Sequence, residues 1–208
     1  NLFFQQGLII RLLIKSDPTT NLKYSSLKIA LLFKRKRLLV FVIFIGIFSL
    51  SYSIGTQSKL SDEESQTFLK EFQNAVKGID AIGIFEHNAS VALPMFVPGA
   101  GLIWGTFAAW STGLAFGALV ATNPILAKVP PLALLYLSPF GLMELAAYSI
   151  GMSRSLLLIL AIVRKQSLKI ELRHAGIEIG IVLALLLAGG FIEYYMIQHF
   201  GSSVVSPK

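Results

Sequence analysis

Cysteine is absent from this 208-residue sequence, and charged side chains are scarce. Without cysteine the chain can form no disulfide, no thiolate metal site and no cysteine nucleophile. Only 14% of its residues are charged, whereas a soluble domain carries about a quarter. Asp, Glu, Lys and Arg are all missing from the 41 residues between His87 and Ala127, both included. These absences exclude an ordinary soluble globular protein and disfavour enzyme chemistry of the usual aqueous kind.

Much of the charge that is present lies at the start of the chain. Residues 1–37 contain eight Lys or Arg and one acid, and they end in a basic run at 34–37. Residues 38–58 follow without a charge, and a helix of that length reaches about 31 Å, enough for a bilayer core. Basic residues collect on the cytoplasmic side of spanning helices, so we predict a cytoplasmic N-terminus. We interpret the basic cluster as a contact with anionic lipid rather than with nucleic acid.

Two domains follow from this division. Residues 1–37 are predicted to form cytoplasmic basic interfacial helices, one over 2–14 and one over 21–33, separated at Asp17-Pro18. Residues 38–208 are predicted to form a transmembrane helical domain. We therefore expect an all-α, polytopic membrane protein with about five transmembrane helices, together with cytoplasmic and extracytoplasmic amphipathic helices.

Residues 56–86 are predicted to be an extracytoplasmic amphipathic segment. They hold three Lys against six acids, and Ser61 with Glu64 three residues later is typical of a capping box. The apolar residues that share one face at helical spacing are Phe68, Leu69, Phe72, Val76 and Ile79. This helix is expected to lie on the outer leaflet or on the other spans; the alternative is a docking surface for an extracytoplasmic partner.

An apolar segment runs from Asn88 to Asn123. A straight helix of that length would be about 54 Å long, well beyond the bilayer core. Pro94 and Pro98 lie near its start, so we predict an elbow around residues 94–99 followed by a span of about 24 residues.

Small residues recur at every fourth position in this span. Side chains four apart share a helix face, and such ridges let helices approach closely in lipid. The first ridge consists of Gly101, Gly105, Ala109, Gly113, Gly117 and Ala121, and a second ridge in the last apolar segment consists of Gly176, Gly180, Ala184 and Ala188. Both ridges predict tight helix packing, either within the chain or with another subunit.

The last third of the chain is predicted to cross the membrane three times. The candidate spans are 125–138, 141–163 and 177–198, with a basic cytoplasmic loop between the last two. Together with the two earlier spans they make five, which places the C-terminus outside. Residues 125–138 are expected to be a short, protein-buried span, the alternative being a re-entrant segment.

We single out two carboxylates of the predicted spans, Glu144 and Glu193, together with Glu86, His87 and Asn88 at an outer membrane edge. An ionisable group in the bilayer requires a partner. We expect a structural polar cluster that locks helices together; the alternative is a site for ion or proton passage. No spacing indicates a catalytic set, and we expect no metal and no cofactor.

Four sequence blocks resemble the stage II sporulation protein M family of integral membrane proteins. They are IFEHNASVALPMFVPGAGLIWGT, STGLAFG, SPFGLMELAAYSIG and LALLLAGGFIEYY. The match covers roughly residues 85–198, while 34–84 match in layout only. Two positions depart from the family pattern. Phe140 stands where histidine is usual, and Thr112 stands where asparagine is common.

The resemblance implies a polytopic membrane protein, and the family's namesakes act as scaffolds that recruit cell-wall hydrolases during sporulation. We therefore expect a non-catalytic scaffold or accessory subunit of a membrane protein complex, located in the cell membrane. The alternative is a small transporter or channel subunit built around the Glu/His cluster. The expected partners are membrane lipid and other membrane subunits or a second copy of the chain, and no nucleic acid.

Overall fold

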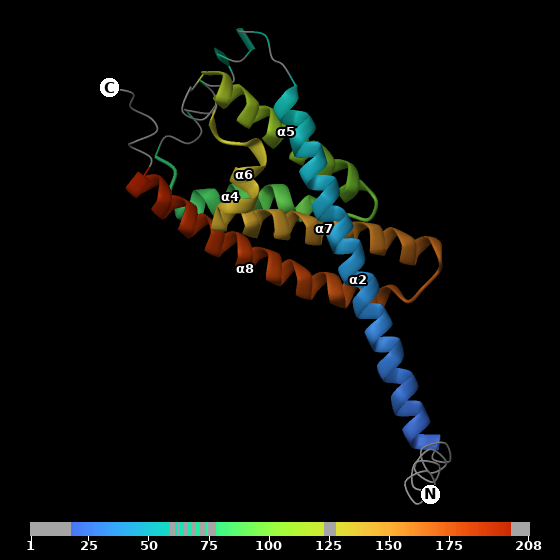
Figure 1. Ribbon diagram of the computed structural model, residues 1–208. Helices are drawn as coiled ribbons and strands as arrows, with labels where there is room; N and C mark the ends of the chain where they lie inside the picture. The colour runs from blue at the N-terminus through green and yellow to red at the C-terminus, as the bar shows by residue number, and fades with distance from the viewer. Residues whose placement is uncertain are drawn as a thin grey trace, which may run out of the picture. The chain divides into compact units, whose positions relative to one another are not determined.

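The computed structural model describes residues 18–58, 78–122 and 128–200, together with positions 61, 63, 64, 66, 67, 70 and 74. In these residues every regular element is a helix (Figure 1). Four helices are long and apolar enough to cross a membrane: 35–57, 100–121, 139–163 and 168–199. The prediction of an all-α, polytopic membrane protein is confirmed. The chain divides into two units, Asn1–Val40 and Phe41–Lys208, and the contacts below lie within the second unit.

Helix α2, Pro18–Gln57, is continuous over 40 residues. It begins at a proline, which fits the first helical position because its missing N–H needs no partner there. Between Asn21 and Phe33 no glycine or proline interrupts it, so the helix predicted over 21–33 runs directly into the first span. The helix predicted over 2–14 lies outside the described residues.

The elbow predicted at residues 94–99 is confirmed. Helix α4, Ala81–Ala92, leads into the short 3₁₀ helix η1, Leu93–Phe96, and the chain then reverses into α5, Ala100–Thr122. Gly99 makes this reversal at φ 76°, a conformation that favours glycine. Helix α5, with 23 residues, is the predicted span of about 24.

Helix α6 corrects the prediction for residues 125–138. It covers Pro131–Leu137, seven residues, which reach about 11 Å and cannot cross a bilayer core. Pro130 and Pro131 set its start, and Ser138 leaves the helix in an extended conformation. Residues 125–127 lie outside the described part of the chain.

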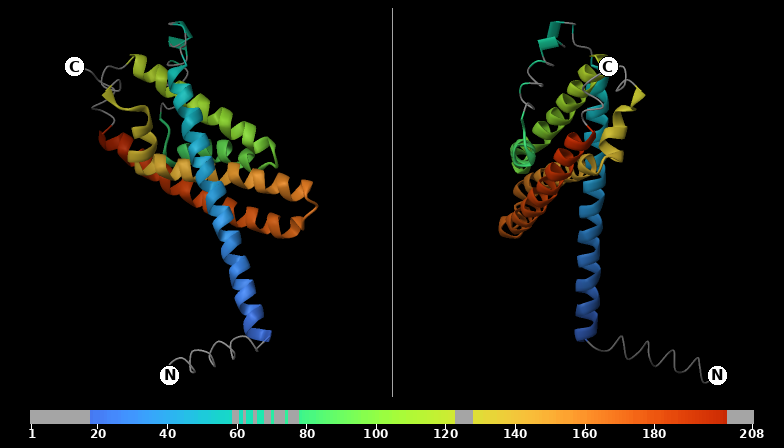
Figure 2. Two further views of the ribbon diagram at one scale, coloured as in Figure 1. Left: turned by 45° about the vertical axis from the view of Figure 1, so that its right-hand side comes forward. Right: turned by 90° about the vertical axis from the view of Figure 1, so that its left-hand side faces the viewer.

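Helices α7, Pro139–Val163, and α8, Leu168–Phe200, lie side by side as an antiparallel hairpin (Figures 1 and 2). The predicted spans 141–163 and 177–198 fall within them, and both helices are long enough to cross. Helix α7 also packs against α4, η1, α5 and α6. Its apolar side chains Leu145, Met152 and Leu158 are buried. This helix is therefore the centre of the second unit.

The predicted capping box before α4 is present. Ser61 Oγ accepts from the Glu64 backbone N–H at 3.3 Å, and Glu64 Oε2 accepts from the Ser61 backbone N–H at 2.9 Å. The Ser61 hydroxyl also donates to Glu64 Oε2 and lowers the pKa of that carboxyl. Of the predicted apolar face, Ile79 is described and half-buried. Phe68, Leu69, Phe72 and Val76 lie outside the described residues.

Candidate functional site

Asn88, Glu144 and Glu193 come together from three helices, α4, α7 and α8. Asn88 Nδ2 donates a hydrogen bond to Glu144 Oε1 at 2.8 Å, and the Glu193 carboxylate is close enough to Glu144 for their charges to interact. Asn88 is buried, whereas both glutamates are partly exposed. The structure thus joins three of the five predicted cluster residues in one polar cluster.

The start of α7 sets the position of Glu144. Ser138 caps the helix, with its Oγ accepting from the Gly141 backbone N–H at 3.0 Å, and Pro139 occupies the first turn. Phe140, which replaces the histidine usual in the resembling family, is half-buried in that turn. It brings no titratable group to the start of α7, so the polar chemistry here depends on Glu144.

Glu86 and His87 stay outside the cluster. Both are exposed on α4, and no described residue supplies a hydrogen bond or an opposite charge to either side chain. They flank Asn88 in sequence, but neighbouring helix residues point in different directions. Of this predicted trio, only Asn88 faces α7.

The first small-residue ridge packs inside the chain over most of its length. A Cβ atom on Gly113 would collide with the Tyr52 backbone carbonyl, and one on Gly117 would lie 2.8 Å from the Thr56 carbonyl oxygen. On the facing helix, a Cβ on Gly55 would collide with the Trp110 carbonyl. Helices α2 and α5 therefore meet backbone to backbone, as small residues permit.

The rest of this ridge has other neighbours. A Cβ on Gly105 would collide with the Met152 side chain of α7, and one on Gly101 would collide with the Met95 carbonyl. Ala109 is fully buried, and Ala121, at the end of α5, is exposed. The ridge thus packs α5 against α2, α7 and η1 in turn.

The second small-residue ridge lies on an exposed face of α8. Gly176, Gly180, Ala184 and Ala188 are all exposed, and a Cβ on either glycine would meet no described atom within 4 Å. The buried face of α8 uses other small residues instead: a Cβ on Gly190 would lie 2.9 Å from the Ala81 carbonyl oxygen of α4. This ridge packs against nothing in the part of the chain that is described.

An ion triad that the sequence analysis missed joins α7 to α8. Arg154 of α7 is only 4% exposed. Its Nε and Nη2 donate to the two carboxylate oxygens of Glu178 at 2.7 and 2.6 Å, and its Nη1 donates to Glu171 at 2.6 Å. Bidentate arginine–carboxylate pairs are among the stronger polar contacts in proteins. The triad is therefore a specific clamp between the two helices.

Three buried serines, Ser149, Ser153 and Ser155, lie on the same helix α7 as Arg154. Ser155 donates to the Val97 carbonyl at 2.6 Å and so holds the turn between η1 and α5. Ser153 donates to the Ile150 carbonyl of its own helix. Ser149 Oγ is buried, and no described residue gives it a hydrogen bond. The polar contacts of α7 thus run from Glu144 near its start to the ion triad.

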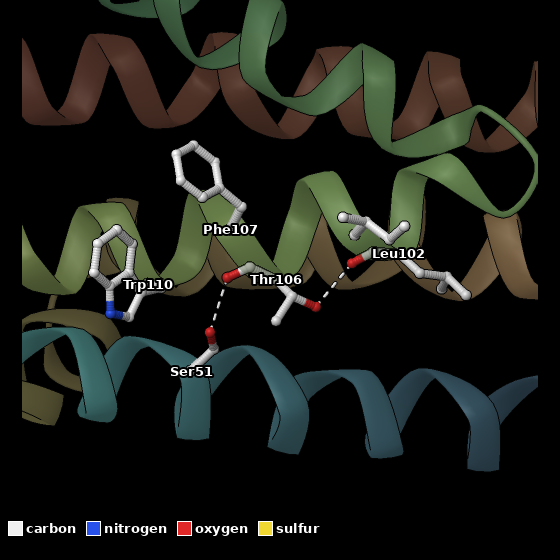
Figure 3. A pocket seen from close by; sticks show the side chains of 6 residues that line it. Ser51, Leu102, Thr106, Phe107 and Trp110 are labelled. Atoms are coloured by element: carbon white, nitrogen blue, oxygen red, sulfur yellow. Dashed lines mark hydrogen bonds between the residues drawn. The ribbon is translucent and has the colours of Figure 1, made fainter.

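A pocket of about 580 Å³ lies between α2 and α5. Figure 3 shows Ser51 donating to the Thr106 carbonyl, and the Thr106 hydroxyl donating to the Leu102 carbonyl, both at 2.8 Å. The other lining residues, Ile103, Phe107 and Trp110, are apolar or aromatic. No titratable side chain lines the pocket, so its walls suit an acyl chain or another apolar group rather than acid–base chemistry.

The arrangement as a whole supports binding and packing. The cluster of Asn88, Glu144 and Glu193 offers carboxylate oxygens that can accept a proton or a cation. Within the described residues no three His, Cys, Asp or Glu side chains are grouped as metal ligands.

One comparison with known proteins gives a match. The family model for Stage II sporulation protein M matches residues 37–196. Neither the curated proteins nor the solved structures include a match to the chain. The matched range includes all four long helices for most of their length.

Proposed function

This chain belongs to the stage II sporulation protein M family, and we propose that it is a non-catalytic scaffold or accessory subunit of a membrane protein complex. Membership supports a multi-pass membrane protein, and the family is not a known family of enzymes. The proposal concerns what such a protein does in the membrane: it holds other subunits, or a second copy of itself, in place.

The exposed ridge of α8 is the observation that carries this proposal. Two small-residue ridges occur in the sequence, and the first packs against other helices of the same chain over most of its length. Nothing described lies within 4 Å of a Cβ placed on Gly176 or Gly180. In lipid, where apolar side chains gain nothing from leaving water, close backbone approach is what drives helix association. The ridge fits a helix of another subunit.

We infer a cytoplasmic N-terminus and an extracytoplasmic C-terminus from the charge pattern. The basic residues 34–37 and the exposed basic residues 164–173 would lie on the cytoplasmic side. The segment α4–η1 is about 26 Å long, and it follows α7 from Asn88 beside Glu144 to Val97 beside Ser155. It would supply the fifth crossing that residues 125–138 do not.

A small transporter or channel subunit is the second candidate. The observation in its favour is the cluster of Asn88, Glu144 and Glu193, which places two carboxylates near each other without a described cation beside them. In this function the cluster would bind the transported ion or proton, with Asn88 orienting Glu144.

Native mass spectrometry of the protein extracted gently from its own membranes tests the proposal. We expect a stoichiometric foreign subunit or a homo-oligomer, and Gly180→Leu should dissociate it because a leucine would fill the space that a neighbouring backbone needs. The matched control is Gly46→Leu, which also adds a side chain at an exposed helical glycine with nothing within 4 Å.

Two results would contradict the scaffold. One is a monomer in mild detergent and in native membranes alike. The other is an assembly that Gly180→Leu leaves intact, which would show that the exposed ridge of α8 is not the contact between subunits. A homo-oligomer that conducts ions in vesicles would support the transporter or channel subunit instead of the scaffold.

A further inference from the structure

The tip of the α7–α8 hairpin, residues 162–173, is an exposed cationic surface. Residues 162–170 are all exposed, as are Leu172 and Arg173. Four cations lie in this stretch, Arg164, Lys165, Lys169 and Arg173. No described residue gives any of these four side chains a carboxylate or hydrogen-bond partner, so their charge is uncompensated within the described part of the chain.

The ion triad holds the nearby acids and offsets only part of this charge. Glu171 lies within the tip and Glu178 follows it in α8, and both are bound to Arg154 at 2.6 Å. Because the buried arginine takes both carboxylates, they face α7 rather than the tip. One guanidinium balances only one of the two carboxylates, so the triad has a net charge of −1. Set against the four cations, this leaves a net charge of +3 at this end of the hairpin, which can attract an anion from outside the chain.

The turn itself holds a cation where glycine would fit better. Helix α7 ends in a Schellman motif, in which the Gln166 N–H donates to the Ala161 carbonyl at 2.9 Å and the Lys165 N–H to the Ile162 carbonyl at 3.1 Å. This motif places Lys165 at φ 53°, in the left-handed region. A non-glycine residue there is unfavourable, and such strain in a native structure points to a use for the side chain.

Apolar side chains are interleaved with the cations. Val163, Ile170 and Leu172 are 71%, 58% and 59% exposed. In water this exposure would be unfavourable, but a membrane interface accepts apolar side chains below the headgroups and cations among them. The combination selects a lipid surface over a free anion in solution.

We propose that the hairpin tip binds the phosphate headgroups of anionic phospholipids, with Arg164, Lys165, Lys169 and Arg173 as the contacts and Val163, Ile170 and Leu172 inserted beneath them. With the orientation inferred above, these lipids are those of the cytoplasmic leaflet, which is rich in anionic headgroups. The site is separate from the exposed ridge of α8, and its test does not depend on any partner.

Lipid binding to the purified full chain in detergent tests the site, with native mass spectrometry counting bound phosphatidylglycerol and phosphatidylcholine. We expect preferential binding of phosphatidylglycerol. Lys165→Gly should weaken that binding about fivefold, since each basic residue near an anionic surface contributes about that factor, and Lys165→Gly with Lys169→Gln should weaken it about 25-fold. Lys128 is an exposed lysine shortly before α6, away from the hairpin tip in sequence. Lys128→Gln is the matched control and should leave phosphatidylglycerol binding unchanged.

Lys165→Gly separates binding from folding. It relieves the left-handed strain, so the melting temperature should stay the same or rise while phosphatidylglycerol binding falls. Equal binding of the two lipids by the wild type would overturn the proposal, and so would an equal effect of Lys128→Gln. Displacement of the lipid by millimolar inorganic phosphate would also overturn it, because it would show a site for a free anion.

Discussion

Arg154 shows what a single charged side chain requires at the residue scale inside a membrane. It interrupts an apolar stretch of α7, and burying its charge without a partner would be costly. The structure supplies Glu171 and Glu178. The need for carboxylates could be predicted from Arg154 alone. Their identity could not, because Glu171 looks like an ordinary surface residue of the basic loop and Glu178 lies at the very start of the span predicted over 177–198.

Glu144 could be singled out from the sequence for the opposite reason. It is a carboxylate in an apolar run, and Asn88 meets it at 2.8 Å. That Glu86 and His87 stay outside the cluster was not predictable, since a shift of one position along α4 turns a side chain by about 100°. Sequence proximity to Asn88 therefore says little about which side chains face α7.

Substitution of Glu144 separates the structural role from the transport role. Gln keeps an oxygen that can accept from Asn88, so Glu144→Gln should preserve assembly and thermal stability. Ala leaves the buried amide unpaired, which costs about 1–3 kcal/mol, so Glu144→Ala should lower the melting temperature. For the scaffold, we expect no ion flux in proteoliposomes from the wild type or from either variant. Flux in the wild type that Glu144→Gln abolishes with assembly unchanged would support transport instead.

At the scale of elements, helix α5 and its ridge were predictable because small residues at a spacing of four share one face. Whether the apolar segments next to α5 cross the membrane or turn back was harder to predict. A run of apolar residues looks the same whether it crosses once or turns back, and the prolines at 94 and 98 mark a bend without fixing its angle. The same ambiguity made residues 125–138 look like a span, whereas α6 has seven residues.

The contact between α2 and α5 gives a prediction at this scale. Gly113→Leu would drive a side chain into the Tyr52 backbone, and overpacking of this kind costs about 1–3 kcal/mol. We expect the melting temperature in detergent to fall by roughly 3–10 °C. Gly46→Leu, on α2 with open space around it, should change it little. Equal melting temperatures for the two variants would contradict the close packing of these helices.

At the scale of the whole molecule, the charge pattern gives the orientation, and the absence of cysteine makes it testable. Single cysteines at positions 61, 128 and 165 replace exposed residues. With a cytoplasmic N-terminus, an impermeant thiol reagent added to intact cells should label positions 61 and 128 and leave 165 unlabelled. Permeabilised cells, in which all three should react, are the control. Labelling of position 165 alone would show the opposite orientation, with the N-terminus outside the cell.

The shortness of the α4–η1 segment bears on how the chain enters the membrane during synthesis. A stretch of about 26 Å with a buried amide is too short and too polar to settle in lipid as an isolated helix. It is therefore expected to leave the translocon together with α5, as one helical hairpin. The acceptor for Asn88 emerges from the ribosome 56 residues later. Until then, α2 is the inserted helix that packs closely against α5, and we expect this contact to hold the hairpin in place.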